Sequence, residues 1–263
     1  NVEVRNGPAG YAGATGNTSL TQEFIDMFEL KNGNLPTADP NYDPQKPWEN
    51  RCERFYASVL YNGAFWWGRE VETFVGGKDY TALNSTAKGC VTGYTLRKHL
   101  DPEVRISGVQ KTTYHDFPLL RFAEILLTYA EAANEYNGMS DDELVDDEMV
   151  YTCVNRVRSR AGLPPVSDKT KGEMREIIHR ERTVELAFEC VRYFDLRRWR
   201  KAEDVLNRPV HGVQITKNEE TGEFVYSEPI EVEERIFPER CYYYPIPQSE
   251  LNKNAALTKN PGW

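Results

Sequence analysis

The segment 180–199 carries the residue types best suited to chemistry in this sequence, carboxylates and guanidinium groups close together. An apolar stripe begins upstream at Met174 and recurs at the three- and four-residue spacing of a helix. Continued along the chain, the stripe reaches Glu181 and Glu185, so two carboxylates fall in the middle of the predicted buried face. A lone buried carboxylate is too costly to keep charged, and each therefore needs a cationic partner or a raised pKa.

Two hypotheses explain these acids. Paired carboxylates on one helical face could transfer protons, as in a helical glycosidase that uses Glu181, Glu185 or Asp195. The alternative is a structural ion network that holds helices in register, supported by arginines nearby in the sequence. We expect the structural ion network, with Glu181 and Glu185 buried away from solvent and from any sugar-sized cleft. Its expected members are Glu181, Arg182, Glu185, Glu189, Arg192, Asp195, Arg197 and Arg198.

Aromatic residues are plentiful and indicate a different kind of site. A flat aromatic face beside amide and carboxylate groups suits a sugar, because ring C–H groups stack on it and the hydroxyls find donors and acceptors. The alternative is that these rings pin long loops to the body. The candidate ligand-binding residues, all in segments rich in Asn, Asp and Gly, are Trp48, Trp66, Trp67, Tyr80 and Tyr42.

Other chemistry is not indicated by the sequence. The four His are far apart and the five Cys have no CxxC spacing, so no metal site is expected. GxSxG, Walker A and GxGxxG patterns are missing, and no cofactor is expected. The net charge of −9 argues against nucleic acid or an anionic membrane as the main partner. No apolar run approaches the length of a membrane span.

Helical periodicity predicts the core of the fold between residues 118 and 207. One stripe includes Leu119, Phe122 and Ala130 and ends before Gly138. A second begins at Val150 and ends at Gly162, with Pro164–Pro165 beyond it. The third helix is the segment around 180–199, with a break near 190–193. Helices that follow one another through short connections favour an array of helical pairs of tetratricopeptide type.

The remaining segments predict loops and small hairpins. We expect a short helix over 22–29 capped by Thr21, a strand over 55–61 that turns at Asn62–Gly63, and a β-hairpin within 210–237. The prediction is a single, mainly α domain over 1–263 with long irregular loops and small β-hairpins. It divides into a loop-rich part (1–117), a helical core (118–207), and a hairpin with a packed tail (208–263).

Several stretches, in order, carry a resemblance to a known family: 21–29, 54–63, 120–132, 154–163, 181–199, 245–247 and 260–263. They resemble the C-terminal region of the SusD/RagB family, surface glycan-binding lipoproteins of Bacteroidetes. Cys52-Glu53, directly before the second stretch, and Cys190-Val191, within 181–199, depart from the family's usual Asp-Pro and Gly-His, which bears on local packing only.

The resemblance implies a SusD-like fold and a non-catalytic role at the cell outer membrane. Such proteins capture oligosaccharide or polysaccharide and deliver it to a SusC-like TonB-dependent transporter. The family's N-terminal half, with its signal peptide and lipid-bearing Cys, has no counterpart here, so we expect membrane attachment only through a lipid that this chain does not carry. Peptide capture, as in RagB-like members, and a scaffold that binds protein alone stay open as alternatives.

Overall fold

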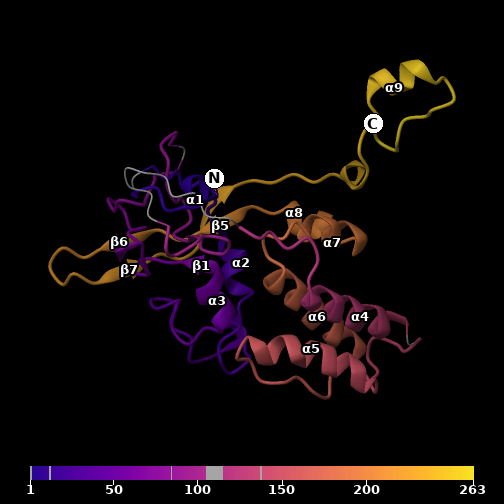
Figure 1. Cartoon of the computed structure of the whole chain (residues 1–263), viewed down its shortest axis with the longest axis horizontal. Coiled ribbons are helices and arrows are strands. Elements are labelled where there is room, and N and C mark those ends of the chain that lie inside the picture. The colour runs from indigo at the N-terminus through magenta and orange to yellow at the C-terminus, as the bar shows by residue number, and fades with distance from the viewer. Residues whose placement is uncertain (1, 12, 84, 105–114, 137) are drawn as a thin grey trace.

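A computed structural model describes residues 2–11, 13–83, 85–104, 115–136 and 138–263 (Figure 1). Helices α4, α5 and α6 pack together on one side of the molecule, and the loop-rich N-terminal part with the small sheets lies on the other. The helices are α1 (Val2–Asn6), α2 (Gln22–Asp26), α3 (Glu53–Ser58), α4 (Phe122–Tyr136), α5 (Glu148–Arg160), α6 (Lys171–Glu185), α7 (Arg192–Arg198), α8 (Ala202–Leu206) and α9 (Gln248–Lys253), with 3-10 turns at Pro36–Ala38 and Glu239–Tyr242.

Short strands form four antiparallel pairs within the described residues. The pairs are β1 (Val59–Leu60) with β4 (Thr95–Leu96), β2 (Phe65–Trp66) with β3 (Arg69–Glu70), β5 (Val210–Gly212) with β8 (Ile230–Glu233), and β6 (Ile215–Lys217) with β7 (Phe224–Tyr226). The β-hairpin expected within 210–237 is present as β6–β7, which lies in sequence between β5 and β8. The mainly helical fold with small two-stranded sheets is confirmed.

The helical core is a cluster of apolar side chains among α4, α5 and α6. Ala130, Val154 and Ile178 are fully buried there, one from each helix. Both later helices begin at a side-chain cap: Asp147 accepts a bond from the amide of Met149 before α5, and Thr170 forms a capping box before α6. These caps fix where each stripe begins and therefore which face turns inward.

Helix α4 differs from its predicted orientation. Its buried residues are Leu127, Ala130 and Asn134. Leu119, which precedes the helix, and Phe122 are instead 92% and 58% exposed. The prediction was wrong at these two positions because α4 carries apolar residues on two faces, and only one of them packs against α5 and α6.

The segment around Phe55 was predicted as a strand and is mostly a helix. Residues 53–58 form α3, which buries Phe55 against Phe28 and turns Arg54 toward α6. These tertiary contacts outweigh the strand propensity of the aromatic and β-branched residues. Asn62–Gly63 is a turn, but β1 before it pairs with the distant β4. The short helix α2 has the predicted Thr21 cap and ends at Asp26 rather than Glu29.

The C-terminal tail packs against the body over only part of its length. Phe237 and Tyr242 join a cluster with α7 and α8. Helix α9 and the residues after it project away from the body (Figure 1), and most of them are exposed. The Trp263 indole donates to the carbonyls of Arg240 and Tyr243, both within the same C-terminal segment. The predicted packing of the tail is therefore wrong beyond Tyr244.

Candidate functional site

The first ion network centres on Glu181 and joins α5 and α6 to α3 and Glu29 of the N-terminal part. Glu181 is 1% exposed and accepts from Arg54 of α3 at 2.6 Å and from Arg158 of α5 at 2.7 Å. Arg158, itself fully buried, also donates to Glu29 at 2.7 Å, and Arg180 bonds the other oxygen of Glu29. Each buried charge in this network has an opposite partner, which buried charges require.

Glu185, one turn further along α6, accepts from three guanidinium groups. Its Oε1 lies 2.5 Å from a nitrogen of Arg121 and also contacts Arg160, and Oε2 lies 3.5 Å from Arg54. Arg121 reaches on to Glu189 at 2.7 Å, and Lys98 donates to the same carboxylate at 2.6 Å. Burial alone would raise the pKa of Glu185, but the hydrogen bond and charge of Arg121 and the neighbouring arginines lower that pKa below its ordinary value.

A second network lies on the other side of α6. Arg182 donates two hydrogen bonds to Asp195, of 2.9 and 3.1 Å. Glu131 of α4 accepts from Arg198 at 2.6 Å and from the Trp199 indole at 2.7 Å. Against the effect of burial, the bonds from Arg198 and Trp199 lower the pKa of Glu131. These contacts fix α7 against α4 and α6.

The partners of the acids on α6 differ from those expected. The prediction was arginines nearby in the sequence, but Glu181 and Glu185 pair with arginines from α3, from α5 and from the residue before α4. Arg192 donates to the hydroxyl of Thr183, and Arg197 bonds the carbonyls of Tyr193 and Cys241. Neither guanidinium forms an ion pair in the described part of the chain. Sequence spacing missed the distant members, which are Glu29, Arg54, Lys98, Arg121, Glu131, Arg158 and Arg160.

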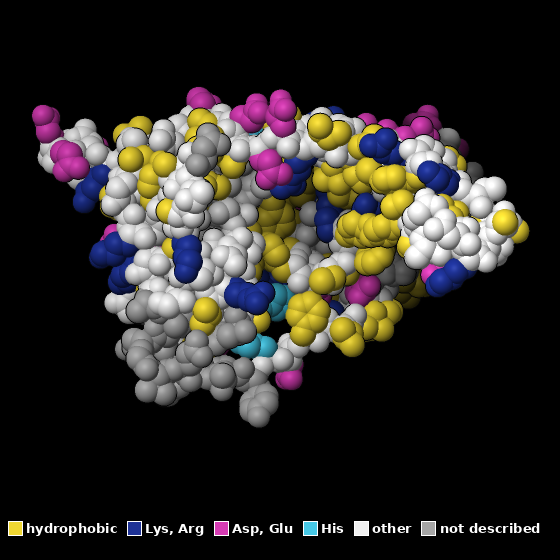
Figure 2. All heavy atoms as spheres, turned by 90° about the horizontal axis from the view of Figure 1, so that it is seen from above, with side chains coloured by type: hydrophobic (Ala, Val, Ile, Leu, Met, Phe, Trp, Pro, Cys, Tyr) yellow, Lys and Arg dark blue, Asp and Glu magenta, His cyan; other side chains and the backbone are white. Residues whose placement is uncertain are grey.

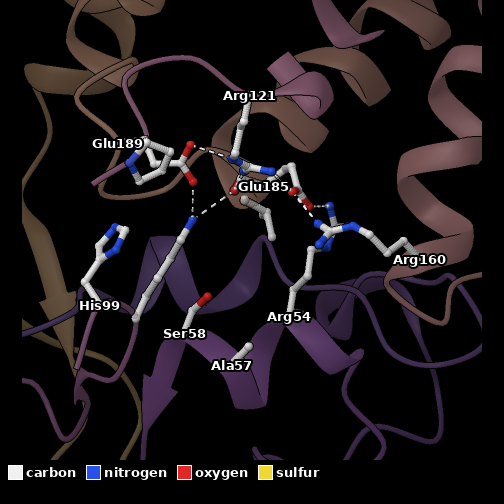
Figure 3. Close-up of a pocket in the computed structure, with 11 residues that line it drawn as sticks. Arg54, Ala57, Ser58, His99, Arg121, Arg160, Glu185 and Glu189 are labelled. Atoms are coloured by element: carbon white, nitrogen blue, oxygen red, sulfur yellow. Dashed lines mark hydrogen bonds and ion pairs between the residues drawn. The ribbon is translucent and has the colours of Figure 1, made fainter. Parts of the chain in front are cut away.

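A cavity of about 330 Å³ opens beside Glu185, in contrast to our expectation that this carboxylate lies away from any cleft. Figure 3 shows the side chains of Arg121 and Arg160 directed toward the carboxylates of Glu185 and Glu189. Lys98, which also lines the cavity, donates to Glu189. Those carboxylates are engaged by cations, and the pKa of each is lowered against the effect of burial. A general acid needs a raised pKa, so this arrangement does not suit Glu185 for proton donation in glycoside cleavage.

The five candidate aromatic residues do not form one surface. Trp48 stacks on Tyr61 with ring centroids 5.5 Å apart and belongs to the edge of the core. Trp66 is 3% exposed, whereas the adjacent Trp67 is half-buried and donates to the carbonyl of Asp101. Tyr42 and Tyr80 are half-buried as well; the Tyr42 hydroxyl accepts from Arg51.

Strand alternation in β2 exposes an aromatic ring that sequence reasoning passed over. Phe65 is 73% exposed, while its neighbour Trp66 points inward. The period-2 pattern of a hairpin strand could have identified it, because successive side chains point to opposite faces. Phe65 therefore extends the candidate aromatic set at the β2–β3 hairpin, where Trp67 is half-buried. Ligand contact by any of these rings stays a prediction.

Within the described residues, no group of three or more His, Cys, Asp or Glu side chains is arranged to hold a metal ion. No described helix is both long enough and apolar enough to cross a bilayer.

Comparison with known proteins gives consistent matches. The family model described as "SusD family" matches residues 3–263. A curated relative, "SusD-like protein P2" of Formosa agariphila, is 30% identical over 180 residues, which is 64% of this chain and 30% of the relative.

Two solved structures from Bacteroides fragilis share the fold. A SusD-like protein superposes with a TM-score of 0.82 at 27% identity, covering 100% of this chain and 51% of its own. A protein described as a SusD-like carbohydrate binding protein has a TM-score of 0.76 at 29% identity, with 97% and 50% covered. The chain thus spans about half the length of these two structures.

Proposed function

Because the chain belongs to the SusD family, we propose that it is part of a non-catalytic protein that binds oligosaccharide or polysaccharide at the cell surface. The observation that carries the proposal is the match over 97% of the chain to a structure described as a SusD-like carbohydrate binding protein. The ion networks support the non-catalytic part, since the carboxylates beside the cavity are held by arginines and lysine.

In this proposal, the bound glycan passes to a SusC-like TonB-dependent transporter in the outer membrane. The contact rings are the half-buried Trp48, Trp67, Tyr42 and Tyr80, together with the exposed Phe65. Trp66 packs against Trp67 from the interior. An aromatic ring that is partly exposed beside polar groups offers a stacking face to a sugar without a large rearrangement.

Affinity gel electrophoresis against a panel of neutral and acidic polysaccharides tests the binding. We expect retardation by at least one polysaccharide, and a weaker effect in Phe65→Ala or Trp67→Ala. Tyr136→Ala is the matched control, because Tyr136 is an exposed ring on α4, away from the candidate set. If no polysaccharide retards the protein and a peptide panel binds instead, the glycan proposal fails in favour of peptide capture.

Delivery to a transporter requires a separate measurement. We expect the transporter encoded beside this protein to co-purify with it from outer membranes in mild detergent. Binding of glycan without any co-purifying transporter would contradict the delivery step and leave the binding step intact.

A further inference from the structure

A second cavity, of about 300 Å³, lies between α6 and the consecutive helices α7 and α8. Its volume is at the lower end of the range of ligand pockets, roughly 300–1,000 Å³. Three apolar side chains and three cations contribute to its wall, namely Met27, Leu196 and Val205, and Arg180, Arg192 and Lys201. None of these residues belongs to the candidate aromatic set, so the cavity is a separate site.

Arg192 is a cation in this cavity that has no counter-ion in the described part of the chain. Its guanidinium is half-buried and donates to the hydroxyl of Thr183 at 2.7 Å. Asp195, whose charge acts on Arg192, is already held by Arg182 and Arg198. Burial therefore lowers the pKa of Arg192 in spite of Asp195. A partly desolvated charge of this kind favours the binding of an anion from outside the chain.

The other two cations in the wall are paired. Arg180 bonds Glu29 at 2.7 Å, and Lys201 bonds Glu176 at 2.6 Å. Figure 2 shows Lys and Arg side chains spread over one face of the molecule, so an exposed cation does not by itself identify a site. What distinguishes Arg192 is that it lines a cavity and lacks a carboxylate partner among the described residues. The cavity thus presents one uncompensated positive charge.

Two further donors belong to the same wall. The Nε of Arg180 is buried and has no hydrogen-bond partner among the described residues. The pKa of His179 is lowered to about 4, so its imidazole is neutral at pH 7. Lys201 can only donate, and its Nζ lies 3.1 Å from the Nδ1 of His179, so the proton of the neutral ring is on Nε2. The polar part of the cavity therefore offers donors, which suit the oxygens of an anion.

A carboxylate on a sugar ring fits this combination of groups. Its two oxygens match the fork of a guanidinium, which can donate two parallel bonds to them. One uncompensated charge calls for a single anionic group. The apolar side chains of Met27, Leu196 and Val205 provide a surface for the C–H groups of the ring beside that carboxylate.

We propose that this cavity binds the carboxylate of a uronic acid residue, with Arg192 as the residue that selects for the charge. The inference rests on the proposed function and narrows its ligand to an acidic polysaccharide. Arg192 bonds the carboxylate, while Arg180 and Lys201 stay in their ion pairs with Glu29 and Glu176. The aromatic residues of the first site contact other sugars of the same chain.

Isothermal titration calorimetry tests the selection with polygalacturonate, alginate and hyaluronate, each compared with its methyl ester. Esterification keeps the sugar backbone and removes the charge. We expect at least one polyuronate to bind, its ester to bind about tenfold more weakly or less, and Arg192→Gln to weaken binding of the polyuronate by about tenfold or more. Arg235→Gln is the control, because Arg235 is exposed and does not line the cavity.

A second substitution adds a charge without removing a buried group. Val205 is 38% exposed at the rim of the cavity, so Val205→Glu places a carboxylate there that competes with the ligand for Arg192. We expect binding of the polyuronate to weaken by about tenfold, with no loss of Tm. Val225→Glu makes the same change at a position on β7 that is 50% exposed, and it should leave binding unchanged.

The outcomes separate this inference from the proposed function. Equal affinity for a polyuronate and its ester would overturn the inference and leave glycan binding intact, and so would polyuronate binding that neither Arg192→Gln nor Val205→Glu weakens. Binding of neutral or sulfated polysaccharides without any polyuronate would overturn it in the same way. Poly-L-glutamate that binds as tightly as the polyuronate, and is weakened equally by Arg192→Gln, would assign the cavity to an acidic peptide instead. If no polysaccharide binds at all, the proposed function fails and the inference fails with it.

Discussion

Glu185→Gln separates a structural role of the acids on α6 from a catalytic one. The substitution keeps the size of the side chain and removes its negative charge. Glu185 is 3% exposed and faces Arg121, Arg160 and Arg54. Removing one partner from a buried ion pair typically costs about 3–5 kcal/mol, because the remaining charge is left uncompensated. We expect a loss of about 3 kcal/mol in the free energy of unfolding, at the lower end of that range, since Arg121 keeps Glu189 and Arg54 keeps Glu181.

The pH dependence gives the same prediction a second test. The pKa of Glu185 is lower in the folded protein than its ordinary value, so the folded state binds its proton less readily than the unfolded state. The stabilisation by Glu185 is therefore fully present above the unfolded pKa of about 4.3 and is lost as the pH falls through the folded pKa. The difference between the parent protein and Glu185→Gln should shrink in that acidic range.

Urea unfolding followed by circular dichroism at pH 7 measures the effect. Glu176→Gln is the matched control on the same helix, because the Glu176 side chain is 63% exposed and forms an ion pair with the partly exposed Lys201. The control should change the unfolding free energy by no more than about 0.5 kcal/mol. If Glu185→Gln is as stable as the control and the parent protein hydrolyses a glycan that the variant does not, the structural reading is refuted in favour of the glycosidase.

Three further predictions concern other parts of the fold. Burial lowers the pKa of His179 to about 4, aided by the charge of Lys201. The folded protein should therefore lose stability as the pH drops from about 6.5 toward 4, and His179→Gln should remove this pH dependence from acid-unfolding curves. Arg51→Lys should lower the free energy of unfolding, measured in urea, by about 2 kcal/mol, because Arg51 is fully buried and its guanidinium donates to the carbonyls of three different residues. Arg235→Lys, at an exposed position, is the control. Thr170→Ala should cost about 1 kcal/mol by removing the cap of α6, and Thr170→Ser should restore most of it.

The sequence pattern correctly predicted features that depend on neighbouring residues, such as the buried face of α6 and the cap of α2. The stripe through Met174 places Glu181 and Glu185 inside, as the structure confirms, because helical periodicity alone decides which side chains share a face. The cap at Thr21 is likewise a contact between residues three apart. In each of these positions, the information needed lies within a few residues of the chain.

The ion pairs that the sequence did not predict join residues far apart in the chain. Arg54 lies 127 residues before its partner Glu181, and no spacing rule connects them. The same long-range bond explains why residues 53–58 form a helix, since α3 turns Arg54 toward α6 while burying Phe55. The end of α6 was also predicted too late: the break was expected near residues 190–193, but the helix ends at Glu185. Phe188 and Cys190 then adopt positive φ values, which are uncommon for residues other than glycine and are not recognisable from the sequence.

The ion pairs of Glu181, Glu185 and Glu189 join the loop-rich part to the helical part. Arg54 and Lys98 belong to the N-terminal part, yet both end on carboxylates of the 181–189 segment. On another side of the same helix, Arg182 holds α7 through Asp195. The segment 180–199 therefore acts as a shared anchor whose charges fix the loop-rich part that carries the candidate aromatic rings. It follows that a variant such as Glu185→Gln can weaken the proposed glycan binding without contacting the glycan, by loosening the part of the fold that carries Phe65 and Trp67.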